Sequence, residues 1–98
     1  MTYVEIKLPE DMKFTSRGAV SFATKIVSEA CQHRSVDYNI KTNDGTYVDL
    51  KSIMGVMTLN YNSASTITIQ VISDDVQVEA YEADHIRKYI NSIIPDYK

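Results

Sequence analysis

The sequence predicts an α+β domain with the element order βαββαβα, in which a four-stranded antiparallel sheet is covered by helices on one face. Two periodicities lead to this prediction. Short segments alternate apolar and polar residues, as half-buried strands do, and between them lie segments with apolar residues at every third or fourth position, as in amphipathic helices. The 98 residues and 44% apolar content suit one modest core, so residues 1–98 are expected to form a single domain.

The first strand is expected at residues 4–8, where apolar side chains alternate with charged ones, and Pro9 closes it. A loop rich in charged and hydroxyl side chains, residues 10–17, then leads to the first helix. We expect this helix to begin at Gly18 with Ser16 as its N-cap. Its apolar stripe is predicted to consist of Val20, Ala23, Val27, Ala30 and Cys31.

Residues 36–40 alternate again and predict the second strand, and residues 47–50 predict the third. Between them, Asn43-Asp44-Gly45 is typical of a tight hairpin, because Asn and Gly tolerate positive φ. A middle helix is expected from the N-cap Ser52 to about Leu59.

A loop at residues 60–63 separates the middle helix from a fourth strand at residues 66–71, which alternates isoleucine and valine with threonine and glutamine. Asp74 or Asp75 is expected to cap the final helix, which Pro95 stops. The predicted apolar stripe of that helix is Val76, Ala80, Ala83, Ile86, Ile90 and Ile93.

Composition excludes several classes of function. The net charge of −3 and scattered basic residues argue against direct nucleic-acid binding. No segment approaches the roughly 20 apolar residues of a membrane span, and charges interrupt the N-terminal residues, so neither a membrane segment nor a signal peptide is expected and the chain looks cytoplasmic. Cys31 is the only cysteine, so neither a disulfide framework nor a cysteine metal site is expected. No metal site, cofactor pocket or nucleophile–base pair is evident, and His33 and His85 are interpreted as ordinary surface or helix-end residues.

The middle helix carries more apolar side chains than one buried face can hold. Between Ile53 and Leu59 only Thr58 is polar, whereas a two-turn helix buries about half of its circumference. Some of the set Ile53, Met54, Val56, Met57 and Leu59 is therefore expected to face outward. Methionine is common on surfaces that meet several partners, so the surplus indicates a docking site. The alternative is a helix wedged between other elements and buried all round.

Ser52, at the start of this helix, permits two interpretations. An N-cap serine is explained by the hydrogen bond that it accepts from a backbone N–H. A phosphoryl group on the same hydroxyl would be favoured by the free N–H groups of the helix, and it would place about two negative charges beside an apolar patch. Such an arrangement would allow phosphorylation to change the choice of partner.

Three segments together resemble a known family. "DLKSIMGVMTL" (residues 49–59) and the preceding hairpin "YNIKTNDGTYV" resemble the regulatory serine region of HPr, the phosphocarrier protein of the bacterial sugar phosphotransferase system. "FATKIVSEA" (residues 22–30) is similar to the family's "PATxLVxxA". The resemblance covers nearly the whole chain and implies the family's fold, an open-faced β-sandwich with the order βαββαβα.

The resemblance fails at the family's reactive segment, "GxHARPA", whose histidine takes a phosphoryl group from enzyme I. Here the segment reads "RGAVSFA", which places Ala19 at the histidine position, Ser21 at the arginine and Phe22 at the proline. Alanine has no nucleophile, so the comparison implies a non-enzymatic protein with no catalytic residue. An active phosphocarrier that uses another residue is a remote alternative, because a serine phosphate ester such as one on Ser16 or Ser21 is a poor donor.

The similarity to the family is preserved in the serine region. In Gram-positive members the serine is phosphorylated by HPr kinase/phosphorylase, and the product is a corepressor for the catabolite control repressor. The family includes Crh, a paralogue that lacks the histidine and keeps the serine. By this comparison Ser52 is the regulatory phosphorylation site, and the docking residues are Lys51, Ile53, Met54 and Met57. The chain departs further than Crh, which retains the "ARPA" residues, so a divergent domain with an unrelated protein partner or with self-association stays open.

Overall fold

The computed structural model describes residues 1–10, 14–43, 45–61 and 64–97. The elements follow in the predicted order, βαββαβα. Along the chain they are β1 (Thr2–Lys7), α1 (Ser16–Cys31), β2 (Asp37–Thr42), β3 (Val48–Asp49), α2 (Ile53–Met57), β4 (Thr66–Ile72) and α3 (Val76–Ile93), followed by a 3₁₀ turn, η1 (Ile94–Tyr97).

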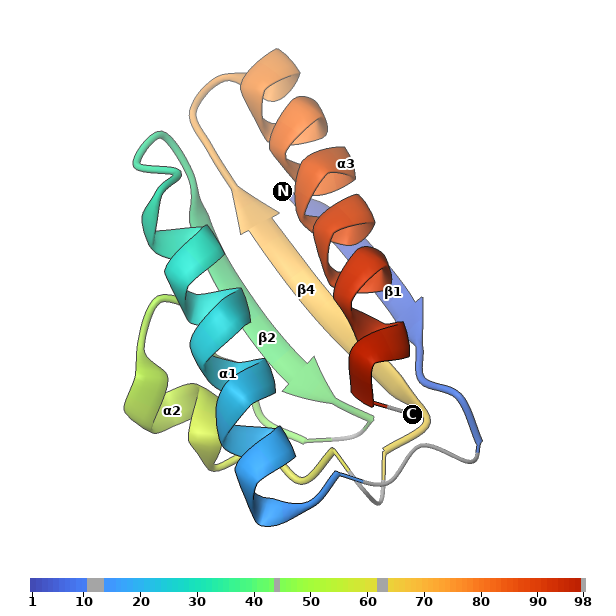
Figure 1. The fold of residues 1–98 in the computed structure, drawn as a ribbon. Helices are drawn as coiled ribbons and strands as arrows, with labels where there is room; N and C mark the ends of the chain where they lie inside the picture. Colours follow the sequence, from blue (N-terminus) through green and yellow to red (C-terminus); the bar gives the residue numbers. More distant parts are fainter. Residues whose placement is uncertain (11–13, 44, 62–63, 98) are drawn as a thin grey trace.

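The four strands form one antiparallel sheet in the order β1-β4-β2-β3. Helices α1 and α3 run along the same face of this sheet, and α2 lies beside α1 near the short strand β3 (Figure 1). The predicted α+β fold, with one antiparallel sheet covered by helices on one face, is confirmed.

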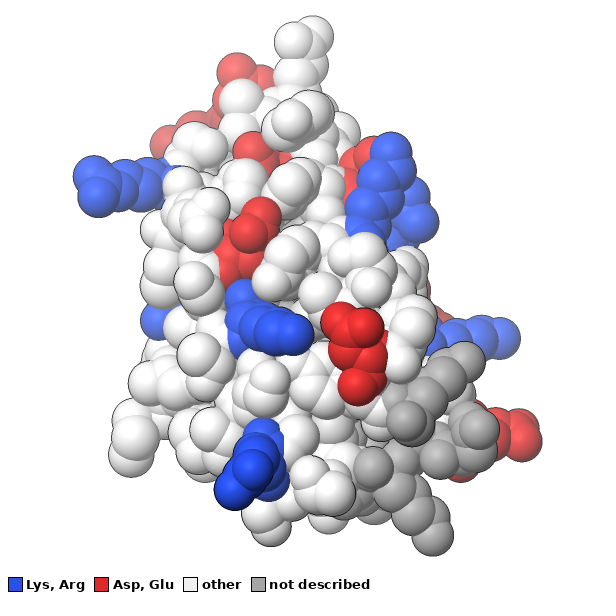
Figure 2. Space-filling view, in the orientation of Figure 1, with Lys and Arg blue, Asp and Glu red and all other residues white. Residues whose placement is uncertain are grey.

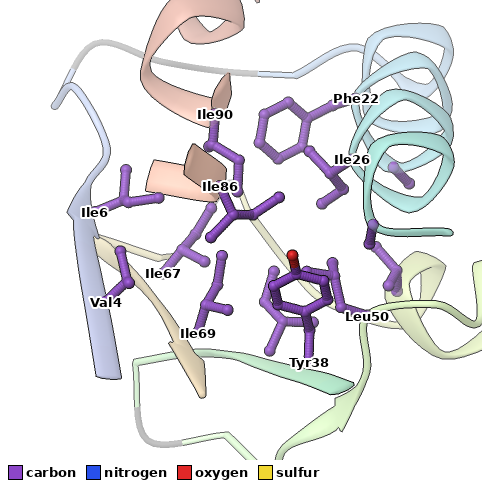
Figure 3. Close-up of a cluster of buried hydrophobic side chains, with 14 of the residues drawn as sticks. Val4, Ile6, Phe22, Ile26, Tyr38, Leu50, Ile67, Ile69, Ile86 and Ile90 are labelled. Carbon is purple, nitrogen blue, oxygen red and sulfur yellow. The ribbon is translucent and has the colours of Figure 1, made fainter. Parts of the chain in front are cut away.

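The core lies between the sheet and the two long helices. Alternate side chains of β1, β2 and β4 point inward and are buried, as their period-two pattern predicts. Figure 3 shows how they meet the helices: Ile67 and Ile69 of β4 lie against Ile86 of α3, and Phe22 of α1 enters from the opposite side. Burial of these branched side chains supplies the main driving force for the fold.

Helix α1 begins two residues earlier than predicted. Its N-cap is Thr15, not Ser16, and the Thr15 Oγ1 atom accepts a hydrogen bond from the Gly18 N–H at 2.9 Å. The predicted stripe was also wrong at Val20, which is 45% exposed, and at Cys31, which is exposed. The buried side of α1 consists of Phe22, Ala23, Ile26 and Ala30. Phe22 and Ile26, four residues apart, orient the helix on the sheet, and Val20 is turned away as a result.

In α3 the predicted stripe holds from Ala83 onward but was wrong at its start, since Val76 is 80% exposed and Ala80 is also exposed. The side chain of Asp75 caps the helix by accepting from two backbone N–H groups, and the helix ends before Pro95, as predicted. A buried acid, Glu79, takes the inward position near the start. Its hydrogen bonds from the amino terminus and the Thr2 hydroxyl lower the pKa of Glu79 to about 2.

The hairpin between β2 and β3 agrees with its prediction where it is described. Asn43 has a φ of 42°, the left-handed conformation that asparagine tolerates, and the Gly45 N–H donates to the Thr42 carbonyl at 2.8 Å. Asp44 lies outside the described residues, as do Asn62 and Ser63 of the predicted 60–63 loop. The third strand is shorter than predicted, because only Val48 and Asp49 pair with β2.

Candidate functional site around α2

Ser52 is the N-cap of α2, as predicted. Its backbone is extended, and its Oγ atom accepts a hydrogen bond from the Gly55 N–H at 3.3 Å. The helix has only five residues and ends at Met57, earlier than the expected Leu59, because Thr58 takes the C-cap position. Ser52 is half-buried and directly precedes Ile53, the first residue of α2.

The apolar residues of α2 divide between two sides. Val56 is fully buried and is the anchor of the helix, and the Tyr61 hydroxyl donates to its carbonyl at 3.2 Å. Ile53, Met54 and Met57 are exposed to 37%, 77% and 48% of their surface, and we call these three residues the α2 surface. Leu59 is half-buried against the core. The apolar side chains of α2 that were expected to face outward are therefore exposed to solvent. The alternative, a helix buried on all sides, is wrong for the isolated chain.

Lys51 points inward. Its Nζ atom donates to the carbonyls of His33 and Val36, at 2.9 and 2.6 Å, and lies 5.8 Å from the centre of the Tyr38 ring. The ammonium thus joins α2 to the connection between α1 and β2. A partner could receive this charge only after both carbonyl contacts were broken.

The residue that the resemblance aligns with the family's histidine falls inside α1. Ala19 is the fourth residue of the helix, is half-buried and packs against the core. The N-cap is one turn earlier, at Thr15. The side chain of Ser21, at the family's arginine position, lies 2.9 Å from the Tyr97 hydroxyl, so it contacts the C-terminal 3₁₀ turn.

Behind this end of α1 lies an aromatic cluster, which consists of Phe14, Phe22, Tyr61 and Tyr97. Phe22 is completely buried, and its ring centre lies 5.1 to 5.4 Å from those of the other three. Tilted and edge-on rings at this spacing attract one another beyond simple burial. The cluster could not be predicted from the sequence, because its members come from segments far apart in the chain.

Neither histidine lies near the N-terminus of α1. His33 follows the C-cap of that helix and His85 lies within α3, yet their rings are only 4.7 Å apart and both approach the carboxylate of Glu29. The interpretation as ordinary surface or helix-end residues missed this convergence. The four-residue spacing of Glu29 and His33 was a usable signal, whereas the approach of His85 depends on how α3 packs.

The surface charges are mixed. On the face shown in Figure 2, acidic side chains lie among basic ones and the described residues form no continuous basic patch. Among the described residues, no helix has the length and apolar character required to cross a membrane.

Comparison with known proteins agrees with the observed fold. The family model described as "PTS HPr component phosphorylation site" matches residues 19–92. No curated protein matches the sequence. The structure is similar to that of the HPr phosphocarrier protein from Bacillus anthracis strain Ames, with 26% identity, coverage of 89% of this chain and 99% of that one, and a TM-score of 0.58.

Two other solved structures share the fold. HPr from Thermoanaerobacter tengcongensis is 21% identical over 92% of this chain and 94% of that one, with a TM-score of 0.61. The catabolite repression protein Crh from Bacillus subtilis is 24% identical over 89% and 88%, with a TM-score of 0.53. With the family model covering most of its length and the family's fold throughout, this chain belongs to the HPr family of the phosphotransferase system.

Proposed function

We propose that this chain is a non-catalytic regulatory member of the HPr family that lacks the phosphocarrier histidine and binds protein partners through the α2 surface, with Ser52 as a phosphorylation switch. Members of the family work with protein partners of the phosphotransferase system, and its phosphocarriers are not classical enzymes. Within the family, the proposed role is close to that of Crh.

The observation that carries the proposal is the exposure of Ile53, Met54 and Met57 directly after the Ser52 hydroxyl. Each exposed apolar side chain loses contact with water when a partner covers it, which favours binding by about 25 cal/mol for each Å² buried. Methionines adapt to differently shaped partners because the side chain is flexible and polarizable. Lys51 remains part of the proposed surface, with its ammonium withdrawn in the free protein.

Phosphorylation of Ser52 would act mainly by placing charge beside apolar surface. A phosphoserine carries about −1.5 to −2 charges at neutral pH. Because α2 has only five residues, its helix dipole adds little, and the decisive effect is on which partner accepts a dianion next to the α2 surface. A partner with arginine beside an apolar pocket would gain affinity, and one with acidic residues there would lose it.

The lack of phosphocarrier chemistry is supported by the N-terminal end of α1. Ala19 offers no nucleophile, and Ser21 is engaged with Tyr97. Both histidines of the chain lie far along the sequence from this turn, at the other end of α1 and within α3. A histidine relay through this turn is therefore not part of the proposed function.

The switch is tested by incubating the protein with HPr kinase/phosphorylase and ATP, followed by peptide mass spectrometry. We expect one phosphoryl group on Ser52 and none in Ser52→Ala, with an authentic HPr as the positive control. No incorporation under conditions that label the control would remove the switch from the proposal.

The absence of relay activity is tested with enzyme I and phosphoenolpyruvate. We expect no acid-labile phosphate on this chain, while the authentic HPr is labelled in the same reaction. An acid-labile label would instead establish an active phosphocarrier that uses another residue.

Docking is tested by binding of the phosphorylated protein to the catabolite control repressor, with Met54→Asp and Met57→Asp compared with the exposed control Tyr81→Asp on α3. We expect the two α2 variants to weaken binding at least tenfold and the control to leave it unchanged. If the wild-type protein does not bind, a divergent domain with an unrelated partner becomes the better interpretation.

A further inference from the structure

A second group of chemically active side chains lies away from the α2 surface, between the two long helices. Glu29 is near the C-terminal end of α1, and His33 comes four residues after Glu29, just beyond the C-cap. His85 belongs to α3. Helices α1 and α3 lie next to each other on the sheet, which brings the three residues together from positions up to 56 apart in sequence (Figure 1).

The donor atoms of these residues converge on one point. The Nε2 atom of His85 lies 2.9 Å from Oε1 of Glu29, and the Nε2 atom of His33 lies 3.6 Å from the same oxygen. One donor atom from each of the three residues lies within 4.8 Å of the others. In a tetrahedral zinc site with metal–ligand bonds of 2.0–2.1 Å, neighbouring ligand atoms are about 3.3 Å apart. The two separations from the Glu29 oxygen lie on either side of this value, and the third is no more than 4.8 Å, so the group has the dimensions of a metal site.

A second carboxylate orients His33. The Nδ1 atom of His33 lies 2.5 Å from Oε2 of the buried Glu82, and the Tyr38 hydroxyl donates to the same oxygen at 3.2 Å. Burial and the Glu82 charge raise the pKa of Tyr38, which keeps its hydroxyl a donor. A carboxylate that holds one ring nitrogen and leaves the other for the ion is a common arrangement around metal-binding histidines. The Nδ1 atom of His33 therefore faces Glu82, and its Nε2 atom faces the Glu29 carboxylate.

The carboxylates of Glu29 and Glu82 lie on two sides of the His33 imidazole in a partly buried place. A divalent ion beside Glu29 would offset the negative charge of these carboxylates. The side chains of Glu29, His33 and His85 keep 16%, 20% and 36% of their surface exposed, so an ion can enter from solvent and retain water as a further ligand. Two imidazoles and one carboxylate suit zinc and similar transition metals, whereas magnesium and calcium prefer oxygen ligands alone.

We propose that Glu29, His33 and His85 form a binding site for a divalent transition-metal ion of the zinc type, with Glu82 as the residue that positions His33. The ion would connect α1 to α3 on the side of the molecule opposite the N-terminal end of α1. The three proposed ligands share no residue with Ser52 or the α2 surface, so the proposed function and the metal site can fail separately.

The proposal is tested on the full chain, freed of metal with a chelator and titrated with Zn²⁺ in competition with a chromogenic chelator. We expect saturable binding of one ion per chain that millimolar Mg²⁺ does not displace. His85→Ala and Glu29→Gln should each weaken binding at least tenfold, because each removes one of three protein ligands. The matched control is Asp84→Asn, which changes the acid next to His85 that pairs with Arg87 and Lys88; its affinity should stay within twofold of wild type.

A second measurement needs no variant. Because the chain has only two histidines, the imidazole proton resonances can be assigned and followed by NMR as Zn²⁺ is added. Both rings should shift together and stop shifting at one equivalent. If neither ring shifts, if Zn²⁺ binds equally to His85→Ala, or if stoichiometric binding is absent, the three residues form only a polar contact between α1 and α3 and the proposal is overturned.

Discussion

The N-termini of α1 and α2 use the same capping device but differ in what lies behind them. Thr15 caps α1 with a hydrogen bond of 2.9 Å, and Ser52 caps α2 with one of 3.3 Å. Behind the first turn of α1 lies the aromatic cluster around Phe22, whereas α2 is anchored by the buried Val56. The α1 end is thus built as part of the core, and the α2 end leaves its apolar side chains available. The comparison teaches that a capping hydroxyl alone does not mark a functional site; its surroundings do.

The largest expected loss of stability concerns the aromatic cluster behind α1. Phe22→Ala should lower the free energy of unfolding by about 3–5 kcal/mol, because it removes a fully buried ring that contacts three other aromatic rings. Urea denaturation followed by circular dichroism measures the change. Val20→Ala, on the exposed side of the same helix, is the control and should cost well under 1 kcal/mol. Equal losses in the two variants would mean that the aromatic cluster does not hold α1.

The next effect concerns the ammonium that joins α2 to the rest of the fold. Lys51→Met should destabilise the protein by about 1.5–3 kcal/mol, since it removes charge-assisted hydrogen bonds to the carbonyls of His33 and Val36. Lys7→Met, an exposed lysine on β1, serves as the matched control in the same denaturation experiment. If both variants lose the same stability, Lys51 is free for a partner even in the isolated protein.

The two caps can be compared directly. Thr15→Ala should cost about 1 kcal/mol and Ser52→Ala about 0.5 kcal/mol, because the second hydrogen bond is longer and the helix it caps has only five residues. Thermal unfolding of both variants against wild type measures the difference. A larger loss for Ser52→Ala would show that its hydroxyl is mainly structural, which would weaken the case for a modification site.

The smallest expected effect lies on the α2 surface. Met54→Ala should change the free energy of unfolding by no more than about 0.5 kcal/mol, since 77% of the side chain is exposed. The same substitution is expected to weaken partner binding, so stability and affinity should separate at this residue. A loss of stability above about 1 kcal/mol would mean that Met54 supports the fold instead.

Much of the fold was accessible from the sequence because the deciding information is local. Period-two alternation identified the strands, and Ser52, Asp75 and Pro95 acted at helix ends as predicted. The errors arose where distant packing decides. Thr15 replaced Ser16 as the cap, and Val20 left the predicted stripe, because Phe22 and Ile26 orient α1 on the sheet. The orientation of α1 on the sheet cannot be read from the residues of the helix alone.

In the candidate sites too, features set by local sequence could be predicted and features set by distant packing could not. The exposure of Met54 and Met57 could be inferred by counting apolar residues on a short helix. The inward turn of Lys51 could not, because its acceptors belong to the connection between α1 and β2. Only half of the group Glu29, His33 and His85 could be inferred from the sequence, as a four-residue spacing at the C-terminal end of one helix. The third member, His85, comes from α3.

The buried tyrosines provide this protein with its own optical signal. The chain has seven tyrosines and no tryptophan, so its near-ultraviolet absorbance comes chiefly from phenols. Burial raises the pKa of Tyr38 and of Tyr61 above the ordinary value of 10. Their protonated form is therefore retained by the folded state while an unfolded chain would release those protons, and stability falls as the pH rises beyond 10. In an alkaline titration the phenols of Tyr38 and Tyr61 should ionise late, and this delayed, cooperative step would report the opening of the core without any attached label.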